Sequence, residues 1–333
     1  MPAITYVDDD LPGITRRKLR GKWAYFDAKD ERIKDREEID RLNAIGLPPA
    51  YRDAWFCPSP DGHIQAIGYD EKGRKQYRYH TGFREQQEAA KYDRCAAFGL
   101  ALPLLRARVE SDLAGRKLAF DTVVAAIVRL LDLGKVRVGN EGYAKANKSF
   151  GATTLRARHA QVSGSRLKLE YKGKSGKVQR LTIEDGRLSR MARRCQDLPG
   201  QHLFQYLDDD GTAHPIGSAD VNAYIRDATG GDFTAKHFRT WGASVIAFRT
   251  LIESGDKPCS VKGMLEPVAE ALGNTPAIAR KSYVHPALIE IAKSGESMAG
   301  LKLPRATRYL QPAERGLVAF LETIGDTAAK KAA

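Results

Sequence analysis

The hydrophobic pattern of the chain changes near residue 95, and this change limits what it can fold into. Before it, short aromatic and β-branched runs are split by the turn signals PDG (60–62) and KG (72–73), which predict antiparallel hairpins. After it, apolar residues recur every three or four positions, which predicts amphipathic helices. A chain of 333 residues is long enough for two cores. We therefore predict an α+β protein with a small, strand-rich domain over 1–95 and a larger, mainly α-helical domain over 96–333.

Local signals bound several elements. Residues 35–55 contain a short helix ended by Gly46 and Pro48. Residues 83–115 are helical, and we expect Pro103 to separate two helices, because proline removes a backbone hydrogen bond.

The second domain contains a helix over 120–134, with Asp121 as its N-cap and Gly134 at its end. A strand pair over 166–171 and 178–185, joined by a glycine-containing turn, forms a small antiparallel sheet. Further helices are predicted over 218–230, begun by Ser218 or Asp220 with Gly230 beyond the end, over 237–255, and over 312–325 before a short disordered tail.

The residue types that bind metals are scattered. The four cysteines form no CxxC pair and the seven histidines no HxH or HExxH motif, so we expect no disulfide framework, metal site or cofactor. Residues 171–178 lack the Walker spacing, and the calcium-like run at 206–211 has Tyr206 and Gly217 where carboxylates are needed. No apolar run approaches the roughly 18 to 20 residues of a membrane span, and no secretory signal is evident, so we expect a cytoplasmic protein.

The net charge of +13 predicts a polyanionic partner. The basic residues cluster with aromatic ones, which favours a nucleic-acid surface over a merely soluble basic protein. The clusters lie at residues 14–22, 73–80, 168–180 and 234–242.

Breaking a DNA strand without a metal requires a nucleophile, an acid for the leaving oxygen, and fixed donors for the charge on the phosphate. If the nucleophile is a tyrosine, the bond energy is kept as a phosphotyrosine and the strand is resealed. Arginine suits the donor role because its planar guanidinium binds phosphate bidentately.

Four stretches carry residues of these types: KVRVGNEGYAKANKSFGATTLRARHA (135–160), YKGKSGK (171–177), KHFRTWGAS (236–244) and LGNTPAIARKSYVHP (272–286). They resemble segments of the type IB DNA topoisomerases, specifically the compact bacterial and poxvirus-like branch, and the resemblance extends over nearly the whole chain. It implies Tyr283 as nucleophile and Lys174, on a mobile hairpin, as general acid. It also implies a set of residues that bind the phosphate: Arg137, Arg239 and Asn274, the last at a position that is His or Asn in this branch.

The N-terminal domain adds LPPAYRDAW (47–55) and GRKQYRYH (73–80), which are similar to the DNA clamp of this family. The resemblance implies major-groove contacts for Gln76, Tyr77 and Tyr79. We expect further DNA contacts from Arg74, Lys75 and Lys236, and Lys236 either binds a flanking phosphate or assists protonation of the leaving group.

The resemblance implies a tyrosine recombinase/topoisomerase IB-like fold that forms a clamp around double-stranded DNA. The expected enzyme is a monomer, associated with the nucleoid, that relaxes supercoils through a 3′-phosphotyrosine, strand rotation and religation. It needs neither ATP nor an essential metal.

Taken one at a time, the same residues have ordinary interpretations. Tyr283 is an aromatic that packs at a helix end, Lys174 a solvated turn residue, and Arg137 a cap for helix carbonyls. The motif FRT occurs twice, and we choose Arg239 because it lies near a helix start, whereas Arg249 lies mid-helix on a solvated face.

Two other functions remain open. A tyrosine recombinase uses the same chemistry, but it typically has His-x-x-Arg where this chain has Lys236 to Arg239, and its N-terminal domain is helical. A non-catalytic DNA-binding protein on the same scaffold has no need of a nucleophile.

Overall fold

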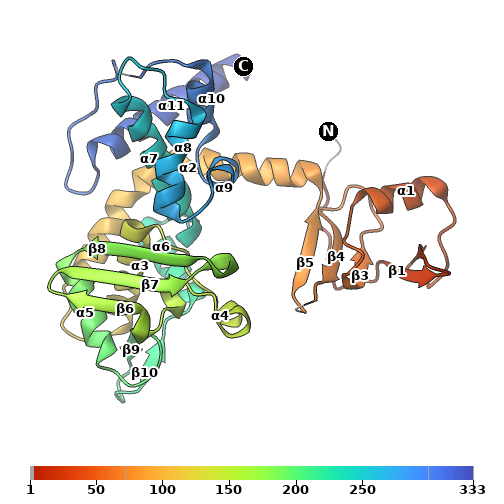
Figure 1. Ribbon diagram of the computed structural model, residues 1–333, viewed down its shortest axis with the longest axis horizontal. Coiled ribbons are helices and arrows are strands. Elements are labelled where there is room, and N and C mark those ends of the chain that lie inside the picture. Colours follow the sequence, from red (N-terminus) through yellow and green to blue (C-terminus); the bar gives the residue numbers. More distant parts are fainter. Residues whose placement is uncertain (1–3, 72, 299, 333) are drawn as a thin grey trace. The chain divides into compact units, whose positions relative to one another are not determined.

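The computed structural model describes residues 4–71, 73–298 and 300–332. The fold divides into two compact units, Met1–Lys91 and Tyr92–Ala333 (Figure 1). The division lies within helix α2 (Thr81–Asp112), a few residues before the boundary predicted at 95. No helix in the described ranges is long and apolar enough to cross a membrane.

The first unit is built on an antiparallel sheet of five strands with the order β2-β1-β3-β4-β5, so that β2 and β5 form its edges. Arg20 and Gly21 join β1 to β2, and both have positive φ, as a two-residue hairpin of this hand requires. The elements are β1 (Ile14–Leu19), β2 (Lys22–Phe26), α1 (Arg36–Ala44), β3 (Arg52–Phe56), β4 (Ile64–Tyr69) and β5 (Lys75–Tyr79).

Helix α1 covers the core of this unit. Its N-cap Asp35 accepts a hydrogen bond from the backbone N–H of Glu37, and Gly46, with φ +66°, follows its end. Leu42 of α1 packs in the same apolar cluster as Phe56 of β3. The predicted hairpins and helix are confirmed, and Lys72 of the β4–β5 turn lies outside the described residues.

The second unit is mainly helical, with two small antiparallel sheets of order β6-β7-β8 and β10-β9 (Figure 1). Helix α3 lies in its core, and the side chains from Val123 to Val128 are at most 1% exposed. The elements after α2 are α3 (Phe120–Gly134), α4 (Glu141–Asn147), β6 (Ala160–Ser163), β7 (Arg166–Lys172), β8 (Val178–Glu184), α5 (Gly186–Gln196), β9 (Gln205–Leu207), β10 (Ala213–Pro215), α6 (Ser218–Thr229), α7 (Ala235–Glu253), α8 (Val261–Leu272), α9 (Pro276–Ser282), α10 (Pro286–Ser294) and α11 (Pro312–Ala332), with short 3₁₀ turns at Ala152–Thr154, Ala157–His159 and Lys174–Gly176.

The strand pair β7–β8 and helices α3, α6 and α7 confirm the predicted pattern. The prediction that Pro103 separates two helices is wrong, because α2 continues through it. Phe98, Leu102 and Leu105 are almost fully buried on either side of the proline. Their packing offsets the lost hydrogen bond.

Two predicted helix ends also differ. The N-cap of α3 is Ala119, without a side-chain bond, and Asp121 lies in the first turn. Helix α6 begins at Ser218, one of the two predicted starts, after its N-cap Gly217, whose N–H donates to Asp220 Oδ2 at 2.8 Å. The predicted disordered tail instead continues α11 to Ala332.

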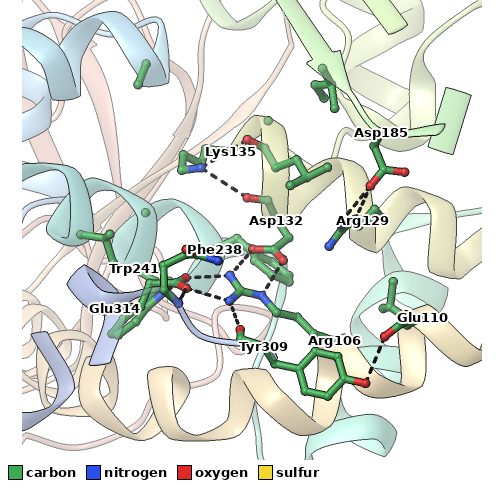
Figure 2. A pocket seen from close by; sticks show the side chains of 18 of the residues that line it. Arg106, Glu110, Arg129, Asp132, Lys135, Asp185, Phe238, Trp241, Tyr309 and Glu314 are labelled. Carbon is green, nitrogen blue, oxygen red and sulfur yellow. Dashed lines mark hydrogen bonds and ion pairs between the residues drawn. The ribbon is translucent and has the colours of Figure 1, made fainter. Parts of the chain in front are cut away.

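A buried network of ion pairs and hydrogen bonds ties four helices of the second unit together (Figure 2). Arg106 of α2 donates from Nε to Asp132 Oδ2 of α3 at 2.8 Å and from Nη2 to Glu314 Oε1 of α11 at 2.7 Å. Trp241 Nε1 of α7 donates to the same Glu314 oxygen at 3.3 Å. The guanidinium thus neutralises two carboxylates that are each 9% exposed.

Replacement of Arg106 by methionine leaves these two carboxylates buried without their ion-pair partner. We expect Arg106→Met to lower the free energy of unfolding by roughly 3–5 kcal/mol, measured by urea denaturation followed through tryptophan fluorescence. The control is Arg166→Met, because Arg166 and its partner Glu184 are exposed and that pair contributes little. A loss no larger than that of the control would contradict the structural role of the network.

Candidate active site

Helices α8 and α9 place Asn274 and Tyr283 at the two ends of one short segment. Gly273, with φ +62°, caps α8, and the Asn274 N–H donates to Ala269 O at 2.9 Å. Thr275 then begins α9 by accepting from the Ile278 N–H at 3.3 Å. Tyr283 is the C-cap of α9 and is half-buried.

Arg239 contacts the ring of Tyr283 from helix α7. Its guanidinium carbon lies 4.7 Å from the ring centroid, and the residue is only 5% exposed. Nη1 donates to the carbonyl of Lys135, and Nη2 donates to Leu272 O at 3.2 Å. Both carbonyls lie at helix C-termini, where the partial negative charge of the helix stabilises a cation.

Lys135 is itself held tightly, at φ +49° after the end of α3. Its ammonium donates to Leu133 O at 3.2 Å and to Asp132 O at 3.4 Å (Figure 2). Burial lowers the pKa of Lys135, and Asp132 partly opposes this. The aliphatic stem of Lys135 crosses α7 at Gly242, where an added Cβ would lie 2.7 Å from Lys135 Cε.

Arg137 and Asn274 form a second pair. Arg137 Nη2 donates to Asn274 Oδ1 at 3.1 Å. Asn274 Nδ2 is buried and has no hydrogen-bond partner within the described residues. A buried amide donor without a partner is costly, so this N–H is available to an incoming acceptor.

Lys174, the last of the predicted catalytic residues, lies on the β7–β8 turn. It is exposed, and the next residues, Ser175 and Gly176, both have positive φ. Neighbouring Lys177 donates from Nζ to the Asn274 carbonyl at 3.4 Å. Turn and helix ends surround a pocket of about 340 Å³. Its lining includes Arg137, Tyr171, Lys174, Lys177, Arg239 and Asn274.

The pKa values of the two tyrosines of the site are shifted in opposite directions. Burial alone would raise the pKa of Tyr283, but the charges and hydrogen bonds of Arg239, then Arg137, outweigh it and lower that pKa below its ordinary value. Burial raises the pKa of Tyr171 to about 12 despite the same two arginines. Tyr283 is therefore the phenol that ionises more readily, as a nucleophile requires.

Lys236 does not line this pocket. It is exposed in the first turn of α7, one turn before Arg239. Arg249, the other candidate of the repeated motif, is exposed on α7 and pairs with Glu253 at 3.7 Å. Arg239 near the start of α7 and Arg249 on its exposed face lie where the sequence places them, and the role of Arg239 stays a prediction.

The remaining predicted DNA contacts lie on edge strand β5 of the first unit, except Arg74, which directly precedes the strand. Tyr77 and Tyr79 are exposed and stacked, with ring centroids 5.8 Å apart. Lys75 pairs with Asp9.

Asp70 binds Arg74 and Gln76, the other two predicted DNA contacts of the first unit. Arg74 Nη2 lies 2.6 Å from Asp70 Oδ2, and Gln76 Nε2 donates to the same oxygen at 3.0 Å. Carboxylates therefore already engage Arg74, Lys75 and Gln76 in the first unit.

Tyr171 and Lys177 were missed as site residues in the sequence. Tyr171 is one of the alternating apolar residues of β7 and Lys177 one of several lysines in a turn. Neither pattern separates a site residue from a core or surface residue. Among the residues that the structure describes, no group of three His, Cys, Asp or Glu side chains is arranged to hold a metal.

The family models and the relatives found by sequence agree on one family. The family model described as eukaryotic DNA topoisomerase I, catalytic core, matches residues 80–294, and that of the bacterial DNA topoisomerase IB N-terminal domain matches 22–70. DNA topoisomerase 1B of Acanthamoeba polyphaga mimivirus is 32% identical over 287 residues, covering 82% of this chain and 85% of the viral protein. DNA topoisomerase 1B of Vaccinia virus (strain Copenhagen) is 22% identical, covering 68% and 72%.

Among solved structures, the XerH site-specific recombinase bound to its difH substrate is 16% identical, with a TM-score of 0.37. The match covers 58% of this chain and 52% of the recombinase chain. This score is too low to establish a shared fold.

The two arginines account for the lowered pKa of Tyr283, so their removal should raise it. We expect Arg239→Met, and to a smaller extent Arg137→Met, to shift the titration of Tyr283 to higher pH. The measurement is NMR of ring-¹³C-tyrosine protein, with Tyr283→Phe to assign the resonance. Arg249→Met removes an exposed arginine from the same helix, and an equal shift in that variant would contradict the assignment.

Proposed function

The chain belongs to the type IB DNA topoisomerases, and on this premise we propose that Tyr283 is the nucleophile with which it breaks and rejoins one strand of duplex DNA. The observation that carries the proposal is the contact of Arg239 with the Tyr283 ring, beside a pocket lined by Arg137 and Asn274. A readily ionised phenol then lies next to donors suited to a phosphate.

In the proposed reaction the Tyr283 oxygen attacks phosphorus and the bond from phosphorus to the 5′ oxygen breaks. The phenol proton passes to solvent, and Lys174 gives a proton to the departing 5′ oxygen. The products are a 3′-phosphotyrosine and a free 5′-hydroxyl end. Religation is the reverse reaction, and because the covalent bond retains the phosphodiester energy, it needs no ATP.

Arg137, Arg239 and Asn274 hold the non-bridging oxygens in this proposal. The two guanidiniums supply charge and forked donors. Asn274 supplies its buried Nδ2 donor, which has no partner within the described residues. Asn274 is neutral, so it contributes a weaker hydrogen bond than a protonated histidine would.

Lys174 is supported as the acid by its place on an exposed turn that borders the pocket. Ser175 and Gly176 adopt positive φ beside it, which favours a tight tip that carries the ammonium toward the pocket.

The first unit is proposed to bind the duplex through Arg74, Lys75, Gln76, Tyr77 and Tyr79, while Lys236 binds a phosphate near the active site. Strain in the supercoiled DNA drives rotation of the free end. We further propose that the enzyme acts as a monomer on nucleoid DNA in the cytoplasm, in keeping with its net charge of +13.

The decisive assay uses negatively supercoiled plasmid with EDTA and without ATP. We expect a ladder of relaxed topoisomers, and we expect Tyr283→Phe to bind DNA with little change while forming no covalent adduct and relaxing nothing. Adduct in the Tyr283→Phe protein would mean another nucleophile. Recombined plasmid dimers would favour a recombinase, and binding without any strand breakage would favour a non-catalytic protein.

A second test concerns Lys75, which Asp9 neutralises in the first unit. If Lys75 binds a DNA phosphate, Asp9 competes with that phosphate. We expect Asp9→Asn to strengthen duplex binding about two- to fivefold at low salt, the range of an exposed ion pair. The measurement is fluorescence anisotropy with a labelled duplex.

Asp10→Asn is the matched control, because it changes the net charge equally and Asp10 is exposed. The advantage of Asp9→Asn over Asp10→Asn should disappear when Lys75 is alanine. If Asp9→Asn still binds more tightly than Asp10→Asn when Lys75 is alanine, then loss of the Asp9 charge does not act by freeing Lys75 to bind DNA.

A further inference from the structure

The backbone that follows Tyr283 leaves the helix and needs partners outside it. The N–H groups of Tyr283 and Val284 both donate to Ala279 O at 3.0 Å. The N–H of His285 instead donates to Ser244 Oγ of helix α7, at 3.1 Å. A side chain from another helix therefore supplies the acceptor for the backbone two residues after the nucleophile.

Ser244 is 0% exposed and lies in the middle of α7. Its hydroxyl donates to Thr240 O, one turn earlier, at 2.9 Å. A serine in a helix commonly makes this bond, which leaves its oxygen lone pairs free to accept. The His285 N–H uses that capacity, and the Tyr283 carbonyl oxygen lies 3.5 Å from the same Oγ.

Helix α7 thus contacts the nucleophile twice. Arg239 lies against the phenol ring, and Ser244, five residues further along the same helix, holds the backbone. Because a helix is stiff, these two contacts fix the ring relative to the guanidinium.

We propose that Ser244 is a positioning residue for Tyr283, holding the Tyr283–His285 backbone so that the phenol stays against Arg239 for attack. This inference rests on the proposed function, in which Tyr283 is the nucleophile.

Other contacts hold the same segment without linking it to Arg239. The Val284 side chain is 0% exposed, and Tyr92 Oη lies 3.5 Å from the Lys281 carbonyl. The ring of His285 packs against Tyr92, with centroids 5.6 Å apart, and its Nδ1 accepts from the Ala287 N–H at 3.2 Å. These contacts keep the segment folded when Ser244 is changed, so the loss should be one of positioning.

The test compares Ser244→Ala with Thr250→Ala in the full chain. Thr250 makes the same type of bond on α7, from Oγ1 to Ile246 O at 2.9 Å. It is not one of the residues that Ser244 contacts in the segment after Tyr283. The rate of covalent adduct formation is measured in a single turnover, on a duplex that cannot religate. DNA affinity is measured separately in the Tyr283→Phe background.

We expect Ser244→Ala to slow adduct formation about tenfold, the effect of one buried hydrogen bond, while DNA affinity changes less than about twofold. The rising limb of the pH–rate profile should move to higher pH. The charged groups that face the phenol are Arg239 and Arg137, and a ring that moves away from them has a higher pKa. Thr250→Ala should change neither rate nor profile.

Equal rates for Ser244→Ala and Thr250→Ala would overturn the inference, as would an unshifted pH profile. If Ser244→Ala does not fold, Ser244→Thr is compared with Ser244→Val instead. Threonine and valine have the same shape as each other, and only threonine keeps the hydroxyl. Equal rates in that pair would also overturn it. Adduct formation by the Tyr283→Phe protein would instead refute Tyr283 as the nucleophile. Failure of the positioning role of Ser244 and failure of the proposed function therefore give different results.

Discussion

The site depends on a buried positive charge that needs partners. Arg239 is 5% exposed, and burial lowers its pKa while Tyr283 opposes this. A charge removed from water is tolerated only where its donors find acceptors. Arg239 finds them in the carbonyls of Lys135 and Leu272 and in the face of the Tyr283 ring. Three segments that are far apart in sequence therefore meet around one guanidinium.

Helix ends supply most of this arrangement. Helices α3 and α8 both close with a left-handed residue, Lys135 and Gly273, and each then directs the chain to a site residue. Arg137 follows the first end and Asn274 the second, and the two side chains bond to each other at 3.1 Å. The carbonyls at these ends carry partial negative charge, so the same backbone that leads to Arg137 and Asn274 also stabilises the guanidinium of Arg239.

Patterns of neighbouring residues predicted what local physics decides: the β7–β8 hairpin, the amphipathic helices and the end of α1 at Gly46. They failed where packing overrides local preference, as at Pro103, which lies within α2 between buried leucines. The candidate site residues came from family resemblance, because no spacing brings Arg137 to Asn274. Tyr171, Lys177 and Ser244 have no signature in the sequence, since their contacts exist only after the chain has folded.

Gly242 extends this dependence beyond the groups that would meet DNA. It touches no phosphate in the proposed site, yet the stem of Lys135 fills the space of its missing side chain, and the Lys135 carbonyl receives Arg239. A methyl group at Gly242 would displace the stem of Lys135. Movement of Lys135 would then disturb Arg239, which donates to the Lys135 carbonyl. Any side chain at this position therefore forces the Lys135 stem to move, so Gly242 affects the site without lying within reach of the substrate.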